Sequence, residues 1–313
     1  MKVGIIGGGG RVGSDAAYAL QLGGIVNEIV LVDMNQDMAD GEALDLRHGS
    51  ALTSSQVITS GGYEALEGAN CVVITAGLRR KPDESRLELI NRNVDLFKKI
   101  LDSLKGVKLA KDATILVVSN PVDILTQLAA KSGILPESQV IGLGTVLDTC
   151  RFRSLLADNF KVGATDVSAL ILGEHGDSMV PILSSATIAG VPLASIPGYS
   201  EDKVKGIFDF TKKSGAEVIR LKGGAGRAVG VSIKVVVEAI ALDSMAIMPI
   251  SSVQHGPLGI NDIALSLPTR VGRLGAVEVL TPKVSAEEEE GLRKSAQALK
   301  DVLNQVMGAP ASV

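Results

Sequence analysis

The chain has 313 residues, and its 31 Lys and Arg against 35 Asp and Glu give a formal net charge of −4 at pH 7. This balance leaves no basic surplus for general binding to nucleic acid or an anionic membrane, so an anionic ligand would be attracted by a few local arginines. No apolar run approaches the roughly 18 residues of a membrane span, and the N-terminus does not resemble a signal peptide. We expect a cytoplasmic chain, long enough for two closely associated domains.

Short β-branched runs alternate with amphipathic stretches through the first half of the chain. The strand candidates are residues 3–6, 29–32, 56–59, 71–75, 114–118 and 140–142. Helical stretches lie between several of them, at residues 12–22, 85–104 and 122–132. Apolar strands that alternate with helices predict a parallel sheet covered on both faces, which is a doubly wound α/β fold.

The pattern changes after about Gly142. The predicted elements are a helix over 147–158, a strand over 166–172, long helices over 200–221 and 226–248, strands over 263–267 and 276–280, and a last helix from Ser285. Ser285 and Glu288 have the spacing of a capping box. We therefore expect a doubly wound domain of residues 1–142 and a mixed α+β domain of residues 143–313, with the helix over 226–248 packed back beside the first domain.

A glycine-rich turn directly follows the first predicted strand. Gly8-Gly9-Gly10-Arg11-Val12-Gly13 matches G-x-G-x-x-G at the start of a helix. Gly8 permits the tight turn, Gly10 lets the backbone approach a pyrophosphate, and Gly13 lets the helix pack close to the sheet. By itself the motif is weak evidence, because glycine-rich turns are common.

Asp33 strengthens the interpretation. It ends the second predicted strand, 20 residues after Gly13. A carboxylate there can accept hydrogen bonds from both ribose hydroxyls of an adenosine and would repel a 2′-phosphate. Strand, turn, helix, strand and acid in this order predict a Rossmann domain that binds NAD in preference to NADP.

Four polar groups follow predicted strands, where α/β sheets bind their ligands. They are residues 79–86, 119–121, 147–153 and 173–177. Each has an ordinary alternative: solvated loop charges, an Asn-Pro turn, an ion pair between Asp148 and Arg151 on a helix surface, and a histidine in a turn. Only their combination argues for a catalytic site.

Over essentially its whole length the sequence resembles the L-lactate/malate dehydrogenase family, through residues 8–13, 31–33, 75–93, 117–123, 144–153 and 173–181. The resemblance implies an NAD-dependent oxidoreductase of 2-hydroxy acids, with a C-terminal catalytic domain, assembled as a homotetramer or, as the alternative, a dimer. An NAD-dependent glycosidase with this fold would need a metal site, and the sequence has no convincing Cys/His cluster for one. A non-catalytic NAD-binding module would give no reason to keep the polar groups together.

The resemblance assigns roles within the four polar groups. His175 matches the family's proton acceptor, and an imidazole suits this work because its pKa lies near neutrality. Asp148 matches the partner that orients the ring, and Arg151 the arginine that holds the substrate carboxylate with two parallel hydrogen bonds. Arg86 matches the arginine that polarises the carbonyl, and Asn120 the asparagine that contacts substrate and nicotinamide ribose.

The resemblance also implies a set of cofactor contacts and a moving loop. The cofactor contacts are Gly8, Gly10, Arg11, Val12, Gly13, Asp33, Asn93, Val118 and Asn120. Residues 79–86 match the family's mobile loop, whose closure over substrate would exclude water and strengthen the charge interactions inside. No metal is implied.

One loop residue decides the expected substrate. Arg80 stands where lactate enzymes of the family carry Gln and malate enzymes carry Arg, and Ala225 stands where lactate enzymes usually have Thr. Pyruvate would leave a buried guanidinium unpaired, at a cost of roughly 3–5 kcal/mol. Residues 174–178 and 217–223 resemble lactate enzymes instead.

We therefore expect a small dicarboxylate substrate and the malate–oxaloacetate reaction of the tricarboxylic acid cycle, as in the lactate-dehydrogenase-like malate dehydrogenases. The alternative is an L-lactate dehydrogenase or a dual-specificity enzyme.

Overall fold

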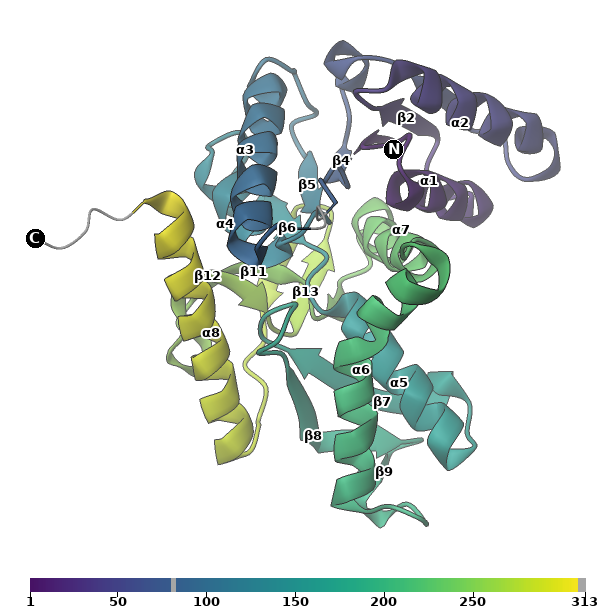
Figure 1. The fold of residues 1–313 in the computed structure, drawn as a ribbon. Coiled ribbons are helices and arrows are strands. Elements are labelled where there is room, and N and C mark those ends of the chain that lie inside the picture. The colour runs from purple at the N-terminus through teal and green to yellow at the C-terminus, as the bar shows by residue number, and fades with distance from the viewer. Residues whose placement is uncertain (80–82, 309–313) are drawn as a thin grey trace, which may run out of the picture.

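The computed structural model describes residues 1–79 and 83–308 (Figure 1). Its first half contains β1 (Lys2–Ile6), α1 (Arg11–Gly23), β2 (Glu28–Val32), α2 (Gln36–Gly49), β3 (Val57–Ser60), β4 (Cys71–Ile74), α3 (Arg86–Lys105), β5 (Thr114–Val117), α4 (Val122–Lys131) and β6 (Val140–Gly142). These strands pair in parallel in the order β3-β2-β1-β4-β5-β6. This is the doubly wound Rossmann order, so the predicted fold class is confirmed.

Two strands from the second half of the chain extend the same sheet beyond β6. They are β11 (Ser251–His255) and β12 (Asn261–Ser266), which pair antiparallel to each other. β11 joins β6 through Ser251 opposite Gly142. An added strand covers the hydrogen-bonding edge that the three-residue strand β6 would otherwise expose. The sheet therefore draws on both halves of the sequence.

Alternate strand residues face two layers of helices (Figure 1). Val3 and Ile5 of β1 are buried against the layer that contains α1, α2 and α7 (Arg227–Leu242). Ile6 belongs to the core shared with α3, α4 and α8 (Ala286–Met307). Because both faces are covered, the central strands are apolar throughout.

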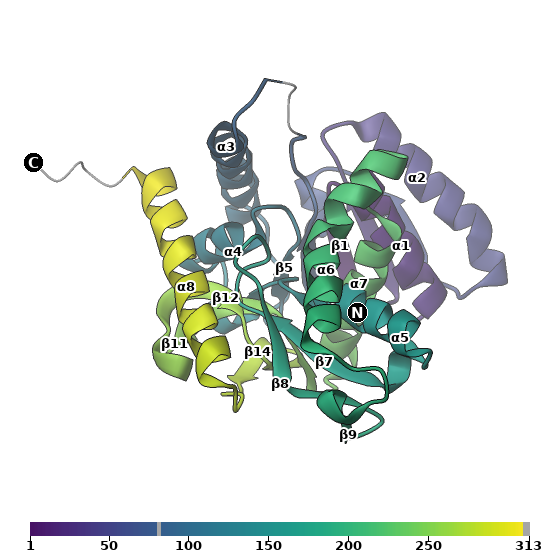
Figure 2. The ribbon, with the colours of Figure 1, turned by 60° about the horizontal axis from the view of Figure 1, so that its bottom comes forward.

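The rest of the second half forms two small antiparallel sheets with flanking helices. One sheet consists of β7 (Val167–Leu172), β8 (Val180–Ile188) and β9 (Val191–Pro192), and the other of β10 (Ala246–Met248), β13 (Thr269–Gly272) and β14 (Gly275–Val279). Figure 2 shows β7 and β8 between α8 on one side and α5 (Val146–Phe160) and α6 (Glu201–Lys222) on the other. The expected mixed α+β architecture is confirmed. None of the described helices is long and apolar enough to cross a membrane.

The helix expected over 226–248 packs against α1 as predicted, but it is shorter. α7 ends at Leu242, where Asp243 adopts a left-handed conformation with φ 49°. Residues 246–248 are not helical. They form strand β10, because they pair with β13. The close approach to α1 depends on Gly230, whose β-carbon would lie 2.6 Å from the Asp15 carbonyl oxygen.

Candidate active site

The glycine-rich turn connects β1 to α1 at the carboxyl end of the parallel strands. A β-carbon on Gly13 would lie 2.2 Å from the Gly7 carbonyl oxygen, and one on Gly8 would lie 2.8 Å from the Leu31 β-carbon. Only glycine permits this approach of helix and strands. Gly10 is the N-cap of α1, and within the described part of the chain no side chain caps it. The free N–H groups of the first turn therefore suit a phosphate.

Asp33 joins the ends of β1 and β2. Its Oδ2 accepts a hydrogen bond from the Gly9 N–H at 3.1 Å, and its Oδ1 accepts one from the Asn35 N–H at 3.0 Å. An ionised carboxylate offers about four acceptor positions, so these two bonds leave capacity for ribose hydroxyls. The turn and Asp33 together fit an adenine dinucleotide.

Arg11 has a partner that the sequence did not indicate. Its Nη1 donates to the carbonyl oxygens of Lys222 and Gly224, each at 2.9 Å, where α6 ends. One turn further along α1, Asp15 forms an ion pair with Arg227 at the start of α7. The Arg11 guanidinium therefore binds protein backbone in this structure, and its role as a cofactor contact stays a prediction.

His175, Asp148 and Arg151 lie together, as predicted. Nδ1 of His175 lies 2.5 Å from Oδ2 of Asp148, and Nη1 of Arg151 donates to the other carboxylate oxygen at 3.0 Å. Asp148 is 1% exposed, whereas the His175 side chain is 24% exposed. A proton on Nδ1, directed at the carboxylate, leaves Nε2 to accept a proton from a ligand.

Opposing effects act on the two titratable groups of this pair. Burial disfavours a charged imidazole, but the Asp148 carboxylate outweighs it and raises the pKa of His175. Burial likewise opposes ionisation of Asp148, but His175 and then Arg151 outweigh it and lower the pKa of Asp148. The arrangement therefore stabilises a protonated ring beside an ionised carboxylate, as a proton acceptor requires.

A second carboxylate contacts the backbone of His175. Asp123 is 2% exposed, and its Oδ2 accepts a hydrogen bond from the His175 N–H at 2.8 Å. Its Oδ1 accepts one from the Ser251 hydroxyl at 2.6 Å. No role was predicted for Asp123 from the sequence.

Arg86 is the first residue of α3 and lies beside the His175 turn. Its Nη1 pairs with Asp177, and its Nη2 lies 3.9 Å from Oε1 of Glu174. Ser85 caps α3 in a capping box with Glu88, which places Arg86 at the end of the 79–86 loop. Arg80, the residue expected to select the substrate, lies outside the described residues.

The other predicted contacts follow β4 and β5. Val118 N–H donates to the Ile74 carbonyl oxygen, and Asn120 is exposed directly after this strand pair. Asn93 is buried and accepts a hydrogen bond from the Leu78 N–H at 2.7 Å. The Asn93 side chain thus braces the start of the 79–86 loop, and its contact with a cofactor stays a prediction.

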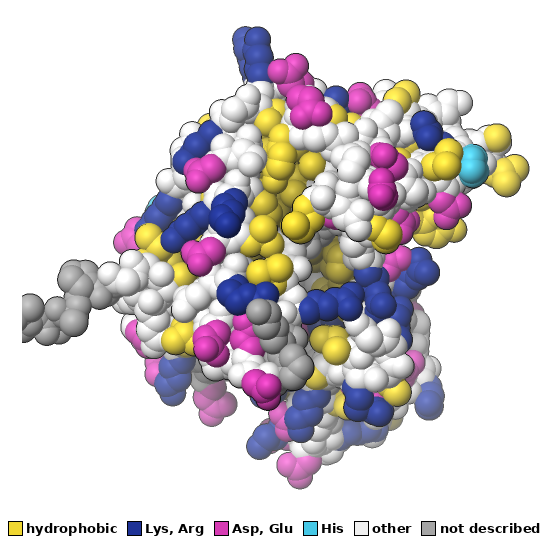
Figure 3. All heavy atoms as spheres, turned by 45° about the horizontal axis from the view of Figure 1, so that its top comes forward, with side chains coloured by type: hydrophobic (Ala, Val, Ile, Leu, Met, Phe, Trp, Pro, Cys, Tyr) yellow, Lys and Arg dark blue, Asp and Glu magenta, His cyan; other side chains and the backbone are white. Residues whose placement is uncertain are grey.

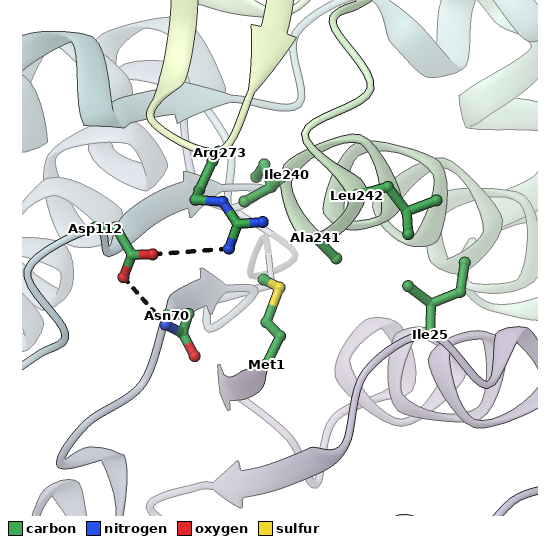
Figure 4. Close-up of a pocket in the computed structure, with 8 residues that line it drawn as sticks. All are labelled: Met1, Ile25, Asn70, Asp112, Ile240, Ala241, Leu242 and Arg273. Atoms are coloured by element: carbon green, nitrogen blue, oxygen red, sulfur yellow. Dashed lines mark hydrogen bonds and ion pairs between the residues drawn. The ribbon is translucent and has the colours of Figure 1, made fainter.

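The structure also has a charged surface patch and a cavity. In Figure 3 a band of hydrophobic side chains runs down the middle of the face, with Lys and Arg side chains gathered below it. A separate cavity of about 220 Å³ is lined by Met1, Asn70, Asp112 and Arg273, among others (Figure 4). Met1, Asn70 and Asp112 precede β1, β4 and β5, so this cavity lies at the amino ends of the strands. It is therefore remote from His175.

The glycine-rich turn and Asp33 follow β1 and β2 of the large sheet, and the His175 group is formed by α5 and the turn after β7. This combination defines the class of the protein, an oxidoreductase with a Rossmann NAD-binding domain. The chain belongs to the lactate/malate dehydrogenase family: residues 1–142 match the family's NAD binding domain, and residues 145–309 match its alpha/beta C-terminal domain.

Curated relatives are similar over nearly the whole chain. L-lactate dehydrogenase 1 of Clostridium acetobutylicum is 42% identical over 310 residues, which cover 97% of this chain and 98% of the relative. L-lactate dehydrogenase of Acetivibrio thermocellus is 42% identical over 95% of this chain and 94% of its own length. The minor L-lactate dehydrogenase from Enterococcus mundtii, solved with ligands bound, has a TM-score of 0.93 at 36% identity, covering 97% of this chain and 98% of its own.

These relatives overturn the expected substrate. The sequence analysis favoured a malate dehydrogenase of the tricarboxylic acid cycle on the strength of Arg80 and Ala225, and this prediction is wrong. The two curated relatives and the solved structure described above, matched over 94–98% of their own length, are named L-lactate dehydrogenases. Arg80 and Ala225 alone do not determine the substrate. The side chains that surround a substrate contact one another, so their effects on specificity are not additive.

Proposed function

We propose that the protein is an NAD-dependent L-lactate dehydrogenase that interconverts L-lactate and pyruvate. The observation that carries the proposal is the 2.5 Å contact between His175 and Asp148, with Arg151 on the other oxygen of the same carboxylate. The names of the curated relatives support lactate and pyruvate as the substrate pair.

The cofactor is held by the first domain. The first turn of α1, opened by Gly8, Gly10 and Gly13, would bind the pyrophosphate, and Asp33 would accept the adenosine ribose hydroxyls. When bound, NAD supplies the hydride acceptor of the reaction. The negative charge of Asp33 supports a preference for NAD over NADP.

His175 acts on the proton. In lactate oxidation its Nε2 takes the proton of the 2-hydroxyl group, and in pyruvate reduction it returns that proton to the developing alkoxide. Asp148 holds the ring in the required tautomer and stabilises the imidazolium. Since the pKa of His175 is raised, the protonated form needed for pyruvate reduction is favoured.

Two arginines and an amide bind the substrate. Arg151 uses one N–H on Asp148, and its remaining donors would bind the substrate carboxylate in a forked pair. Arg86 would polarise the C2 carbonyl after leaving Asp177, and Asn120 would contact substrate and nicotinamide ribose.

The assembly we propose is a homotetramer, with a dimer as the alternative. Exposed apolar side chains on α2 and α7 support an assembly, because contact between subunits would bury them. Their exposed fractions lie between 42% and 56%, for Met38, Leu44, Val231 and Val235. Light scattering of the purified protein measures the assembly, and a stable monomer would contradict the proposal.

Initial rates of NADH oxidation test the reaction. The rate is measured with pyruvate and with oxaloacetate, each over a range of concentrations and without added metal. We expect the higher kcat/KM with pyruvate, and the His175→Asn variant is the control for non-enzymatic oxidation. A higher kcat/KM with oxaloacetate, or no turnover of either acid, would overturn the proposal.

A further inference from the structure

Asp123 connects three segments that are distant in the sequence. It lies in the first turn of α4, three residues after Asn120, and its carboxylate accepts hydrogen bonds from the His175 N–H and the Ser251 hydroxyl. Ser251 belongs to β11, and His175 lies in the turn after β7. The carboxylate therefore links the segment that carries the predicted substrate amide, Asn120, to the backbone of the predicted proton acceptor and to β11.

We propose that Asp123 is a positioning residue, whose buried carboxylate fixes the backbone of His175 relative to Asn120 and places a second negative charge beside the His175 turn. The inference rests on the proposed function for the role of His175. It adds a second carboxylate with a different target from the first: Asp148 binds the ring, and Asp123 binds the main chain.

Both contacts are needed to place the ring. Asp148 orients the imidazole at Nδ1, 2.5 Å away, but a turn that moved as a whole would carry the ring out of reach of a substrate. The 2.8 Å bond to Asp123 prevents this movement, because it ties the turn to the start of α4. Asn120 lies at the same point of the chain, so the distance between the proton acceptor and the substrate amide depends on this bond.

The contacts of Asp123 differ from those of an ordinary helix-terminal acid. A capping carboxylate accepts hydrogen bonds from the N–H groups of its own helix. Both bonds given above for Asp123 instead come from other segments, one from β11 and one from the His175 turn. A carboxylate this deeply buried carries a desolvation cost, which a purely packing role would not require.

The charged groups around His175 include Asp123, whose carboxylate favours the protonated imidazole. Asp148 and Arg151 face it from α5, Asp123 faces it from α4, and Glu174 precedes it in its own turn. Asp148 and Asp123 both raise the pKa of His175, and Arg151 opposes them. Burial raises the pKa of Asp123 to about 6, so the carboxylate is mostly charged at pH 7 and loses its charge below pH 6.

The test compares Asp123→Asn with Asp123→Ala in the full-length protein. Asparagine keeps an oxygen that can accept the His175 N–H but removes the charge, whereas alanine removes both. The pKa of His175 is measured by NMR titration; the chain has only three histidines, and the His175→Asn spectrum assigns the signal. Ser251→Ala is the matched control, since it removes one hydrogen bond from Asp123 but keeps the carboxyl group. Because this bond lowers the pKa of Asp123, the control is compared with wild type above pH 7, where the carboxylate is charged.

We expect Asp123→Asn to lower the pKa of His175 by about half a unit to one unit, the scale of losing one nearby charge. The pH profiles of kcat/KM for lactate oxidation and pyruvate reduction then both move to lower pH by the same amount. Asp123→Ala should lower kcat by roughly 10²-fold, the cost of misplacing a reacting group by about 1 Å. NADH binding should change less than kcat, since the predicted pyrophosphate and adenosine contacts, at residues 8–13 and Asp33, lie in segments that do not contact Asp123.

An unchanged His175 titration in Asp123→Asn would overturn the electrostatic part, and wild-type kcat in Asp123→Ala would overturn the positioning part. A merely structural role predicts lower thermal stability with an unshifted pH profile, which also contradicts the proposal. The NMR titration needs no substrate. It therefore tests this inference whether or not pyruvate is the substrate. If the enzyme turns over pyruvate but the pKa of His175 is the same in Asp123→Asn and wild type, this inference is rejected and the proposed function is not.

Discussion

The guanidinium of Arg11, at the start of α1, donates a hydrogen bond to the carbonyl oxygen of Lys222, at the last turn of α6, at 2.9 Å. A second bond from the same nitrogen reaches the carbonyl oxygen of Gly224. Carbonyl groups at a helix C-terminus have no partners within the helix, and a cation satisfies them well. The helix that begins at the dinucleotide turn is thus tied to the junction between α6 and α7.

Arg11→Ala should lower the free energy of unfolding by about 1–2 kcal/mol, because two charge-assisted hydrogen bonds at an exposed site are lost. Chemical denaturation monitored by circular dichroism measures the change. Arg220→Ala is the matched control on α6: its guanidinium binds Glu217 on the exposed helix surface, so its loss should leave the free energy of unfolding nearly unchanged. Equal losses in the two variants would contradict a special role for Arg11.

His175→Asn should lower turnover by at least about 10²-fold, the usual contribution of a general acid–base group. Asparagine approximates the ring in size but cannot accept the proton. NADH binding, measured by fluorescence titration, should change little, because the predicted dinucleotide contacts lie in other segments of the chain, after β1, β2 and β5 and on α1 and α3. A variant that keeps more than about a tenth of wild-type turnover is incompatible with this role.

Asp33→Asn should reduce the preference for NAD over NADP. Removing the charge removes the repulsion of a 2′-phosphate, while the amide oxygen still accepts the Gly9 N–H. The affinities for NADH and NADPH are measured by fluorescence titration of wild type and variant. Asp37→Asn, on the exposed first turn of α2, is the control for a general change in surface charge. If wild type already bound both dinucleotides equally, Asp33 would not discriminate.

Asp123→Asn should become more stable relative to wild type as pH rises from about 4 to about 6. Burial raises the pKa of Asp123 from its ordinary 3.8 to about 6, so folding favours the protonated carboxyl. The resulting cost is absent below pH 3.8, grows between the two values and is constant above pH 6. Asparagine does not ionise and avoids a cost on the order of 2–3 kcal/mol.

Urea denaturation of both proteins at several pH values between 4 and 8 measures this difference. Asp37→Asn again serves as the control for the loss of one negative charge at an exposed site. A difference between Asp123→Asn and wild type that falls with rising pH would show that the buried carboxylate is stabilised in its charged form.

Much of the fold could be predicted from local patterns. β1 and β2 were found from β-branched runs, and the turn between β1 and α1 from glycines whose missing β-carbons the packing requires. Each of these features depends on only a few consecutive residues. α2 was not predicted, although Asn35 caps it locally. β8 and β11 were not predicted because each pairs with other strands: β11 pairs with β12 and with the end of β6.

The site, like the fold, has features that local sequence predicts and features that depend on distant contacts. The sequence by itself determined the residue types of the chemistry, because a glycine-rich turn and an acid follow two neighbouring parallel strands, and a histidine follows a later strand. Only the tertiary structure decided which groups share a hydrogen bond. Asp123 meets the His175 backbone across 52 residues and Ser251 across 128, and Arg11 meets Lys222 across 211. Contacts over such separations leave no periodic trace in the sequence, because they depend on where whole elements pack against one another.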